Sequence, residues 1–210
     1  MSSLIRNSGF KPPATPFILC VAFFTGFLGF PTWGADFDQA VDDFYSRKYE
    51  NAFISFSVLA AEGDADSASY LGRMYRKGFL VDRDAKKAVE FFQMGIDGGN
   101  LMAHHRLGWM HANGEVTGNR DYISATELWQ VAAERGLYKA QDDIGIMYMR
   151  GDGVEQNFAI AYAWLVIAKE SNPNATAHAN ITVLIEKMTE EDLRAGTILV
   201  SKYRKDYGLE

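Results

Sequence analysis

The chain has 210 residues, with 48% hydrophobic and 23% charged side chains and a formal net charge of −6. This composition is typical of a globular protein with one domain or two small ones, and it argues against intrinsic disorder. An acidic chain is poorly suited to a phosphate backbone, so we expect no nucleic acid among its partners. The single cysteine, Cys20, excludes an internal disulfide and a cysteine-based zinc site.

The first 34 residues have the three-part organisation of a secretory signal peptide. Two basic residues precede Phe17–Phe30, an apolar run of 14 residues that is short for a membrane span of about 20. Thr32 and Gly34 occupy positions −3 and −1 of a cleavage site before Ala35. We therefore expect residues 1–34 to be removed, leaving a periplasmic or secreted protein with no stable membrane insertion after cleavage. An uncleaved anchor or a buried helix is the alternative.

Cleavage at this site would change the composition of the mature protein. The leader carries two basic side chains, no acidic one and the only cysteine, so its removal changes the net charge from −6 to −8. An exported chain without a disulfide depends on packing alone for its stability.

Several residue types recur with periods of 36 and 37 residues, which indicates a structural repeat. A Leu-Gly or Ile-Gly step recurs, with further glycines and an alanine in phase with it. The recurring positions are Leu71-Gly72, Leu107-Gly108 and Ile144-Gly145; Gly78, Gly114 and Gly151; Gly63, Gly99 and Gly136; and Ala52, Ala88, Ala125 and Ala161.

Each repeat predicts two helices, because apolar residues recur at the three-and-four spacing of a helix and side-chain caps precede the second helix. The expected first helices are 65–77, 101–113 and 139–150, and the second helices are 84–97, 121–135 and 157–170. Terminal helices are expected after Asp36, over 49–62, over 175–187 and after Thr189, whose capping partner is Asp192. For the last helix we expect a buried face of Leu193, Gly196, Val200, Tyr203 and Tyr207. About ten helices in five antiparallel pairs result.

The third copy contains Ile144-Gly145-Ile146-Met147-Tyr148-Met149-Arg150-Gly151-Asp152-Gly153-Val154, and the second contains Trp129 before Ala132-Ala133-Glu134-Arg135-Gly136. Over roughly residues 49–171 these columns resemble the Sel-one-like repeat (SLR) family, which is related to the tetratricopeptide repeat (TPR). The resemblance implies an all-α, right-handed α-solenoid. After the signal peptide at 1–34, it also implies an N-terminal TPR-like capping pair at 35–63, SLR repeats at 64–171 and C-terminal capping helices at 172–210.

Two departures from the family pattern concern the inter-helix loops. Leu80 and Val116 replace the second loop glycine, and the loop around Gly118 has one extra residue. We therefore expect the first two loops to differ in shape from the third.

The mid-helix glycines Gly72, Gly108 and Gly145 each cost about 1 kcal/mol relative to alanine. Their recurrence in phase predicts close packing of each first helix against the second helix of its pair.

Few features of the sequence indicate a catalytic or metal-binding site. His104, His105 and His111 lie within eight residues, but two helical turns separate the pair that shares a face, so we expect no metal and no cofactor. The carboxylate pairs Asp142-Asp143 and Glu190-Glu191 are better explained as solvated helix faces than as a glycosidase-like acid and base. A basic stretch between Arg73 and Lys87 is likewise interpreted as a solvated face. We expect no catalytic residues.

We expect a partner to bind the concave face formed by the first helices. The partner-binding residues predicted on this face project away from the packing columns and include the residue types that dominate interfaces. They are Tyr70, Arg73, His105, Arg106, Trp109 and Asp142. The alternative for Trp109 is that it packs on a neighbouring repeat.

The resemblance implies a non-catalytic scaffold or adaptor that binds another envelope or secreted protein or peptide. The family's roles include envelope assembly, polysaccharide export, motility and signalling. A hydrolase of envelope polymers and a receptor for a glycan or small ligand are the alternatives.

Overall fold

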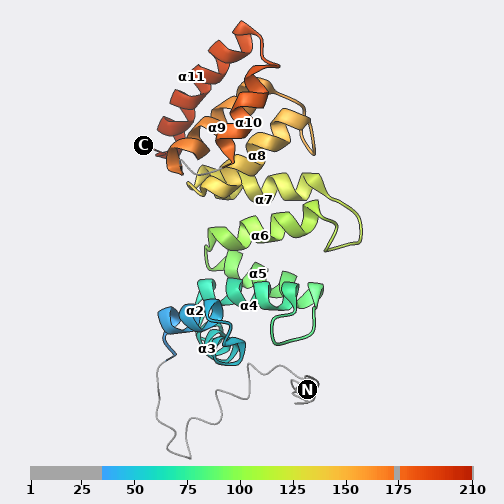
Figure 1. The fold of residues 1–210 in the computed structure, drawn as a ribbon, viewed down its shortest axis with the longest axis vertical. Coiled ribbons are helices and arrows are strands. Elements are labelled where there is room, and N and C mark those ends of the chain that lie inside the picture. Colours follow the sequence, from blue (N-terminus) through green and yellow to red (C-terminus); the bar gives the residue numbers. More distant parts are fainter. Residues whose placement is uncertain (1–34, 173–175, 210) are drawn as a thin grey trace, which may run out of the picture.

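The computed structural model describes residues 35–172 and 176–209, and this part of the chain consists of ten helices and no strands. The helices stack one after another along the long axis of the molecule (Figure 1). Their bounds are α2 Phe37–Tyr45, α3 Tyr49–Ala61, α4 Ala65–Lys77, α5 Ala85–Asp97, α6 Leu101–Ala112, α7 Tyr122–Glu134, α8 Tyr138–Arg150, α9 Phe158–Ser171, α10 Ala177–Ile185 and α11 Glu190–Tyr207. The signal peptide predicted at 1–34 lies outside the described residues.

Eight helices form four pairs: α2 packs on α3, α4 on α5, α6 on α7, and α8 on α9. The second helix of each pair also packs on the first helix of the next, which joins the pairs into one stack. The six repeat helices begin and end within one residue of their predicted bounds. The prediction of an α-solenoid of helix pairs is therefore confirmed.

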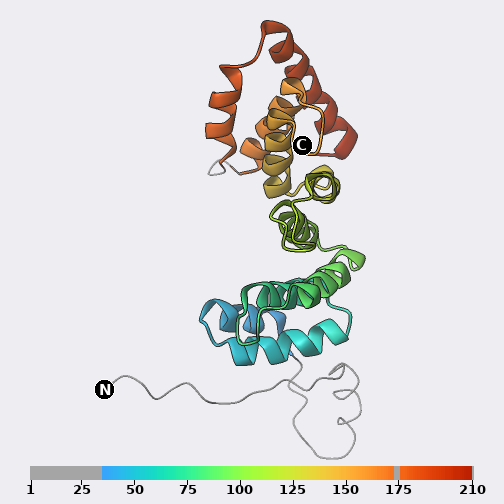
Figure 2. The same cartoon turned by 90° about the vertical axis from the view of Figure 1, so that its right-hand side faces the viewer.

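The C-terminal end has a different geometry from the expected fifth pair. Both α10 and α11 pack on α9, and they lie on opposite sides of it (Figure 2). Gly196 lies against the beginning of α9, whereas Tyr203 and Tyr207 contact Trp164 further along, so α11 runs in the same direction as α9. Two helices that both pack on α9 therefore form the C-terminal end of the stack.

The predicted capping residues start the helices, because each accepts a backbone N–H that has no partner within the helix. The side chains of Asp84, Asp121 and Asn157 each accept from the N–H three residues further on, at 3.0 Å in all three cases. Thr189 and Asp192 form the predicted reciprocal capping box. Local sequence therefore fixes where these helices begin.

The loop after α4 contains a strained residue. Leu80 has a φ of 69°, in the left-handed region, and Gly153 at the corresponding repeat position has a φ of 75°. The backbone at residue 80 thus keeps the conformation of the family glycine, so the expected difference in loop shape is not found at this residue. A side chain with a Cβ pays roughly 1–2 kcal/mol in this conformation.

The mid-helix glycines allow the close packing that the sequence predicts. A Cβ on Gly72 would lie 2.6 Å from the Phe92 ring, and one on Gly145 would lie 2.7 Å from Leu165. Real side-chain contacts are not this short, so only glycine permits these helices to approach so closely. The cost in helix propensity is offset by the buried ring or leucine that each glycine accommodates.

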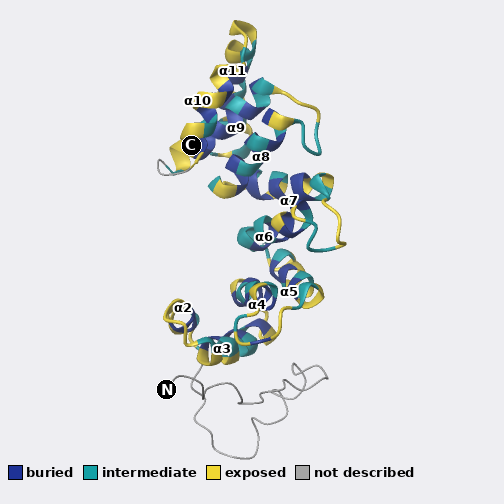
Figure 3. Ribbon diagram, turned by 45° about the vertical axis from the view of Figure 1, so that its right-hand side comes forward, coloured by how far each residue is buried: buried dark blue, intermediate teal, exposed yellow. Residues whose placement is uncertain are grey.

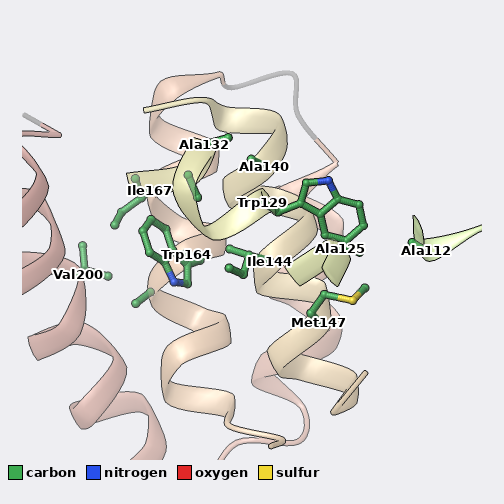
Figure 4. Packing of buried hydrophobic residues seen from close by; sticks show 12 residues of the cluster. Ala112, Ala125, Trp129, Ala132, Ala140, Ile144, Met147, Trp164, Ile167 and Val200 are labelled. Atoms are coloured by element: carbon green, nitrogen blue, oxygen red, sulfur yellow. The ribbon is translucent and has the colours of Figure 1, made fainter. Parts of the chain in front are cut away.

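Buried residues occur in every helix along the stack (Figure 3). In the C-terminal half, Ile144 lies between the indoles of Trp129 and Trp164, and all three are essentially inaccessible to solvent (Figure 4). Each repeat thereby contributes its large side chain to a core shared with the next repeat.

The buried face of α11 is smaller than predicted. Gly196 and Val200 are buried, and Tyr203 lies with its ring 4.8 Å from that of Trp164. Leu193, however, is 37% exposed, so its predicted burial is wrong. Because Gly196 already contacts Ala159 at the beginning of α9, the turn that carries Leu193 projects beyond the supporting helix.

No helix among the described residues has both the length and the hydrophobicity needed to cross a bilayer.

Candidate functional site

The six residues predicted to bind a partner lie on three successive first helices. Tyr70 and Arg73 come from α4, and Asp142 comes from α8. The remaining three, His105, Arg106 and Trp109, come from α6. We call the surface formed by α4, α6 and α8 the first-helix face. The structure arranges its side chains into two groups, one around the arginines and one around Trp109.

The first group, the arginine cluster, consists of Tyr45, Tyr70, Arg73 and Arg106. The Arg106 guanidinium lies 5.5 Å from the centre of the Tyr70 ring, and its Nη1 donates to the Oγ of Ser69 at 2.5 Å. The Tyr70 hydroxyl hydrogen-bonds the Tyr45 side chain, which also hydrogen-bonds Arg73. Side chains from α2, α4 and α6 therefore meet at one place.

Aromatic rings support both guanidiniums from one side. Arg73 lies 4.7 Å above the centre of the buried Phe44 ring and 5.9 Å from that of Tyr45. Tyr70 is itself stacked on Phe56, with ring centres 4.7 Å apart. These cation–π and stacking contacts hold Arg73 and Tyr70 in defined orientations.

The environment of the arginine cluster disfavours the positive charge of Arg106. Burial lowers the pKa of the Arg106 guanidinium from its ordinary value, and the positive charge of Arg73 lowers it further. Burial, together with the hydrogen bond to Tyr45, raises the pKa of Tyr70 to about 12. Two like charges thus lie near each other in a partly desolvated place, which costs energy unless an anion compensates them.

The second group, the tryptophan cluster, consists of His105, Trp109 and Asp143. The Trp109 Nε1 donates to Oδ2 of Asp143 at 3.0 Å, and His105 Nε2 lies 2.8 Å from the same oxygen. Trp109 remains 40% exposed, while its ring centre is 6.2 Å from that of the buried Trp129. Its indole is therefore anchored along its edge and accessible over much of its surface.

Asp142 does not project toward solvent, and the prediction that it does is wrong. It is only 8% exposed, and one carboxylate oxygen accepts from the Thr176 hydroxyl. The other oxygen accepts from Nδ2 of Asn180 at 3.1 Å. Because α10 packs alongside α8 at this point, the Asp142 carboxylate joins these helices within the chain.

Two residues of these clusters were not predicted from the sequence. Asp143 had been interpreted only as part of a solvated carboxylate pair, yet it holds both His105 and Trp109. Tyr45 lies on the capping helix α2 and is 64% exposed. Asp143 lies about one repeat after His105 and Trp109, and equivalent turns of neighbouring first helices lie side by side. This spacing is the feature of the sequence that could have indicated the contact.

The histidines and the basic stretch have partners within the chain. His104 is buried with Nδ1 3.0 Å from the carbonyl of Asn100, and His111 lies 3.6 Å from Asp121. Within the described residues, no group of three or more His, Cys, Asp or Glu side chains could hold a metal ion. In the basic stretch, Arg76 forms a two-point ion pair with Glu115, with both hydrogen bonds 2.8 Å long. This part of the basic stretch therefore links α4 to the loop after α6 rather than facing solvent alone.

The repeats match a known family. Residues 65–100, 101–137 and 139–173 each match the family model described as Sel1 repeat, and together these segments make up just over half of the chain. They begin and end near the bounds of the pairs α4–α5, α6–α7 and α8–α9.

Two solved structures have a similar fold. One is a protective antigen of uropathogenic Escherichia coli strains that displays an SLR fold, with 30% sequence identity and a TM-score of 0.69 over 75% of this chain. The other is a Sel1 repeat protein from Oxalobacter formigenes, with 25% identity and a TM-score of 0.63 over 70% of this chain. The matches cover 33% and 60% of those two chains.

One curated relative is the chitin synthase regulator SKT5 of Saccharomyces cerevisiae. It is 27% identical over 153 residues, which are 72% of this chain and 20% of the yeast protein. The chain thus spans about a fifth of that relative, so the similarity concerns the repeats alone.

Proposed function

Because the chain belongs to the Sel1 repeat family, we propose that it is a non-catalytic scaffold that binds another protein or a peptide through its first-helix face. Sel1 repeat proteins generally mediate protein–protein interaction, and the yeast relative is named as a regulator. Both facts favour a binding role over a catalytic one.

The observation that carries the proposal is the presentation of Trp109. An exposed tryptophan that is held along its edge by Asp143 loses little side-chain entropy when a partner covers it. Tryptophan and arginine are the residue types that contribute most to interface energies, and Arg73 and Arg106 lie on the same face. The first-helix face thus offers anchors that are already ordered.

We further propose that the scaffold acts in the cell envelope after export, in envelope assembly, polysaccharide export, motility or signalling. The support is the order of basic, apolar and small residues before Ala35 in the sequence. Mass spectrometry of the mature protein should find Ala35, or a residue within a few positions of it, at the N-terminus. Recovery of intact protein beginning at Met1 from the cytoplasm would refute export.

Photo-crosslinking in cells tests the binding proposal. A benzoylphenylalanine placed at Trp109 keeps an aromatic group on the first-helix face, and one placed at Met94 serves as the matched control. Met94 is exposed to a similar extent, 38% against 40%, but lies on the second helix α5.

We expect a discrete protein adduct from position 109 and none of the same mass from position 94. Equal adducts from both positions, or none from position 109, would contradict the first-helix face as the binding surface. An adduct that contains carbohydrate and no second polypeptide would instead favour the glycan-receptor alternative.

A further inference from the structure

We propose that the arginine cluster is an anion-binding site that takes the carboxylate of an acidic residue in the partner peptide. The inference rests on the proposed function, because it assigns a role to one part of the first-helix face. It follows from the charge, the orientation and the neighbours of Arg73 and Arg106.

In the part of the chain that the structure describes, neither guanidinium is paired with a carboxylate. Among the described residues, no ion pair within 4.0 Å involves Arg73 or Arg106, although Arg76, Arg83, Arg194 and Arg204 all have one. The nearest acidic influence on Arg106 is Asp66, whose carboxylate accepts a hydrogen bond from the Asn100 side chain. The cluster therefore keeps an excess of positive charge in a protein whose net charge is −6.

Each guanidinium has more hydrogen-bond donors than the partners found for it among the described residues, which are Tyr45 for Arg73 and Ser69 for Arg106. A guanidinium has five N–H donors along its edge, and a ring stacked on its face uses none of them. Phe44 and Tyr45 lie against Arg73, and Tyr70 lies against Arg106. Of the Arg106 donors, Nη1 bonds to Ser69. The remaining edges match the planar, two-oxygen geometry of a carboxylate.

An anion would also relieve the mutual repulsion of the two arginines. Arg73 and Arg106 come from the first helices of neighbouring repeats, and the charge of Arg73 lowers the pKa of the buried Arg106 guanidinium. Cation–π contacts with Phe44 and Tyr70 favour the observed positions of the two guanidiniums. A carboxylate between them would compensate both charges at once.

The distance to the tryptophan cluster defines the peptide more closely. Arg106 and Trp109 are three residues apart on α6, which places their Cβ atoms about 5–6 Å apart on one helix face. In an extended peptide, residues two positions apart point to the same side and are separated by about 6.6 Å. The site therefore fits a peptide in which an acidic residue and an apolar residue are two positions apart.

The test uses the purified protein and a capped pentapeptide, acetyl-Ala-Glu-Ala-Leu-Ala-amide, with its glutamine analogue as the neutral control. Nitrogen-15 NMR follows the Nε–H signals of the arginines, which are assigned through Arg73→Lys and Arg106→Lys. We expect the glutamate peptide to shift both signals and the glutamine peptide to bind at least about tenfold more weakly.

Two variants separate the cluster from general charge effects. Arg73→Gln should weaken binding of the glutamate peptide about tenfold or more, whereas Arg194→Gln on α11 removes an equal charge and should leave it unchanged. Circular dichroism reports whether each variant is folded, and the shifts of the unaltered protein provide a readout that needs no variant.

Equal binding of the two peptides, or shifts absent from both arginines, would overturn the proposal. Shifts caused by inorganic phosphate but not by the glutamate peptide would overturn it in favour of a phosphate group. If crosslinking at position 109 succeeds while Arg73→Gln leaves the adduct unchanged, the anion site fails and the scaffold function stands. If crosslinking at position 109 fails while the peptide shifts the arginine signals, the anion site stands and the scaffold proposal fails.

Discussion

Gly108 lies directly beneath the indole of Trp129, so that a Cβ atom on residue 108 would be 2.5 Å from the indole Nε1. The same Nε1 donates to the carbonyl of His105 at 3.0 Å, one helical turn before Gly108. A glycine and a tryptophan from the two helices of one repeat thus fix the separation of these helices. The carbonyl involved belongs to a residue of the tryptophan cluster, so this packing also supports the first-helix face.

Replacing Gly108 should therefore destabilise the protein although alanine is the better helix former. We expect Gly108→Ala to lower the free energy of unfolding by about 1–3 kcal/mol, because the indole must move and leave its hydrogen bond. Urea denaturation measures this change. Trp129→Ala removes the ring that the added methyl group would meet, so the double variant should lose less than the sum of the two single losses. Strictly additive losses would contradict the contact.

Leu80 offers the opposite case, in which glycine should stabilise. Leu80→Gly removes the strain of a Cβ at a φ of 69°, and we expect a gain of about 0.5–1 kcal/mol after the added entropy of the unfolded chain is subtracted. The matched control is Leu80→Ala, which removes the 41% exposed side chain but keeps the strained backbone. A gain of equal size in the alanine variant would show that the side chain, not the backbone, is responsible.

The neighbours Asp142 and Asp143 serve different interfaces and should be separable. Asp142→Ala removes the acceptor for Thr176 and Asn180, so we expect a loss of about 1–3 kcal/mol and faster hydrogen exchange in α10. Asp143→Ala should leave exchange in α10 unchanged. It should instead release the Trp109 indole, which its fluorescence anisotropy would report. Faster exchange of α10 in both variants would contradict this division.

The ion pair between Arg76 and Glu115 should make stability depend on acidic pH. The hydrogen bonds from Arg76 lower the pKa of Glu115 below its ordinary value of 4.5, so the folded state gains stability that is present above this value. This gain is lost as the pH falls through the lowered pKa of the folded state. At about pH 7 we expect Glu115→Gln to cost about 1–2 kcal/mol, and once the pH is below the lowered pKa of the folded state the variant and the unaltered protein should converge.

Thermal unfolding of both proteins across this pH range measures the difference. Glu127→Gln on α7 removes a carboxylate for which no ion pair is found among the described residues, and it provides the control. A difference at Glu115 that does not change with pH would contradict the assignment to charge.

The helices and their packing contacts were accessible from sequence because their causes are local or periodic. Asp84 and Asn157 start helices through backbone groups three residues away, and apolar spacing along each helix marks its buried face. Gly108 could be assigned to a tight contact because the same glycine recurs in every repeat at a position where it lowers helix propensity.

The partner face was predicted less completely, because its contacts join residues about one repeat apart. Trp109 and Asp143 are 34 residues apart, and so are Asp142 and Thr176. Helical periodicity gives the direction of a side chain relative to its own helix axis. Periodicity does not show which neighbouring helix lies in that direction. From sequence, Asp142 is therefore expected on the surface, and Asp143 has no predicted contact.

The sequence alone determined the repeat, the pairing of the repeat helices and the positions where these helices begin and end, because each depends on residues within one turn or on the recurring period. Only the tertiary structure decided that Asp143 orders Trp109 and that Tyr45 joins Arg73. It also decided that α10 and α11 share α9 as a support. These relationships arise when separate repeats dock, and the rotation and spacing between docked repeats are set by side-chain packing across the whole interface.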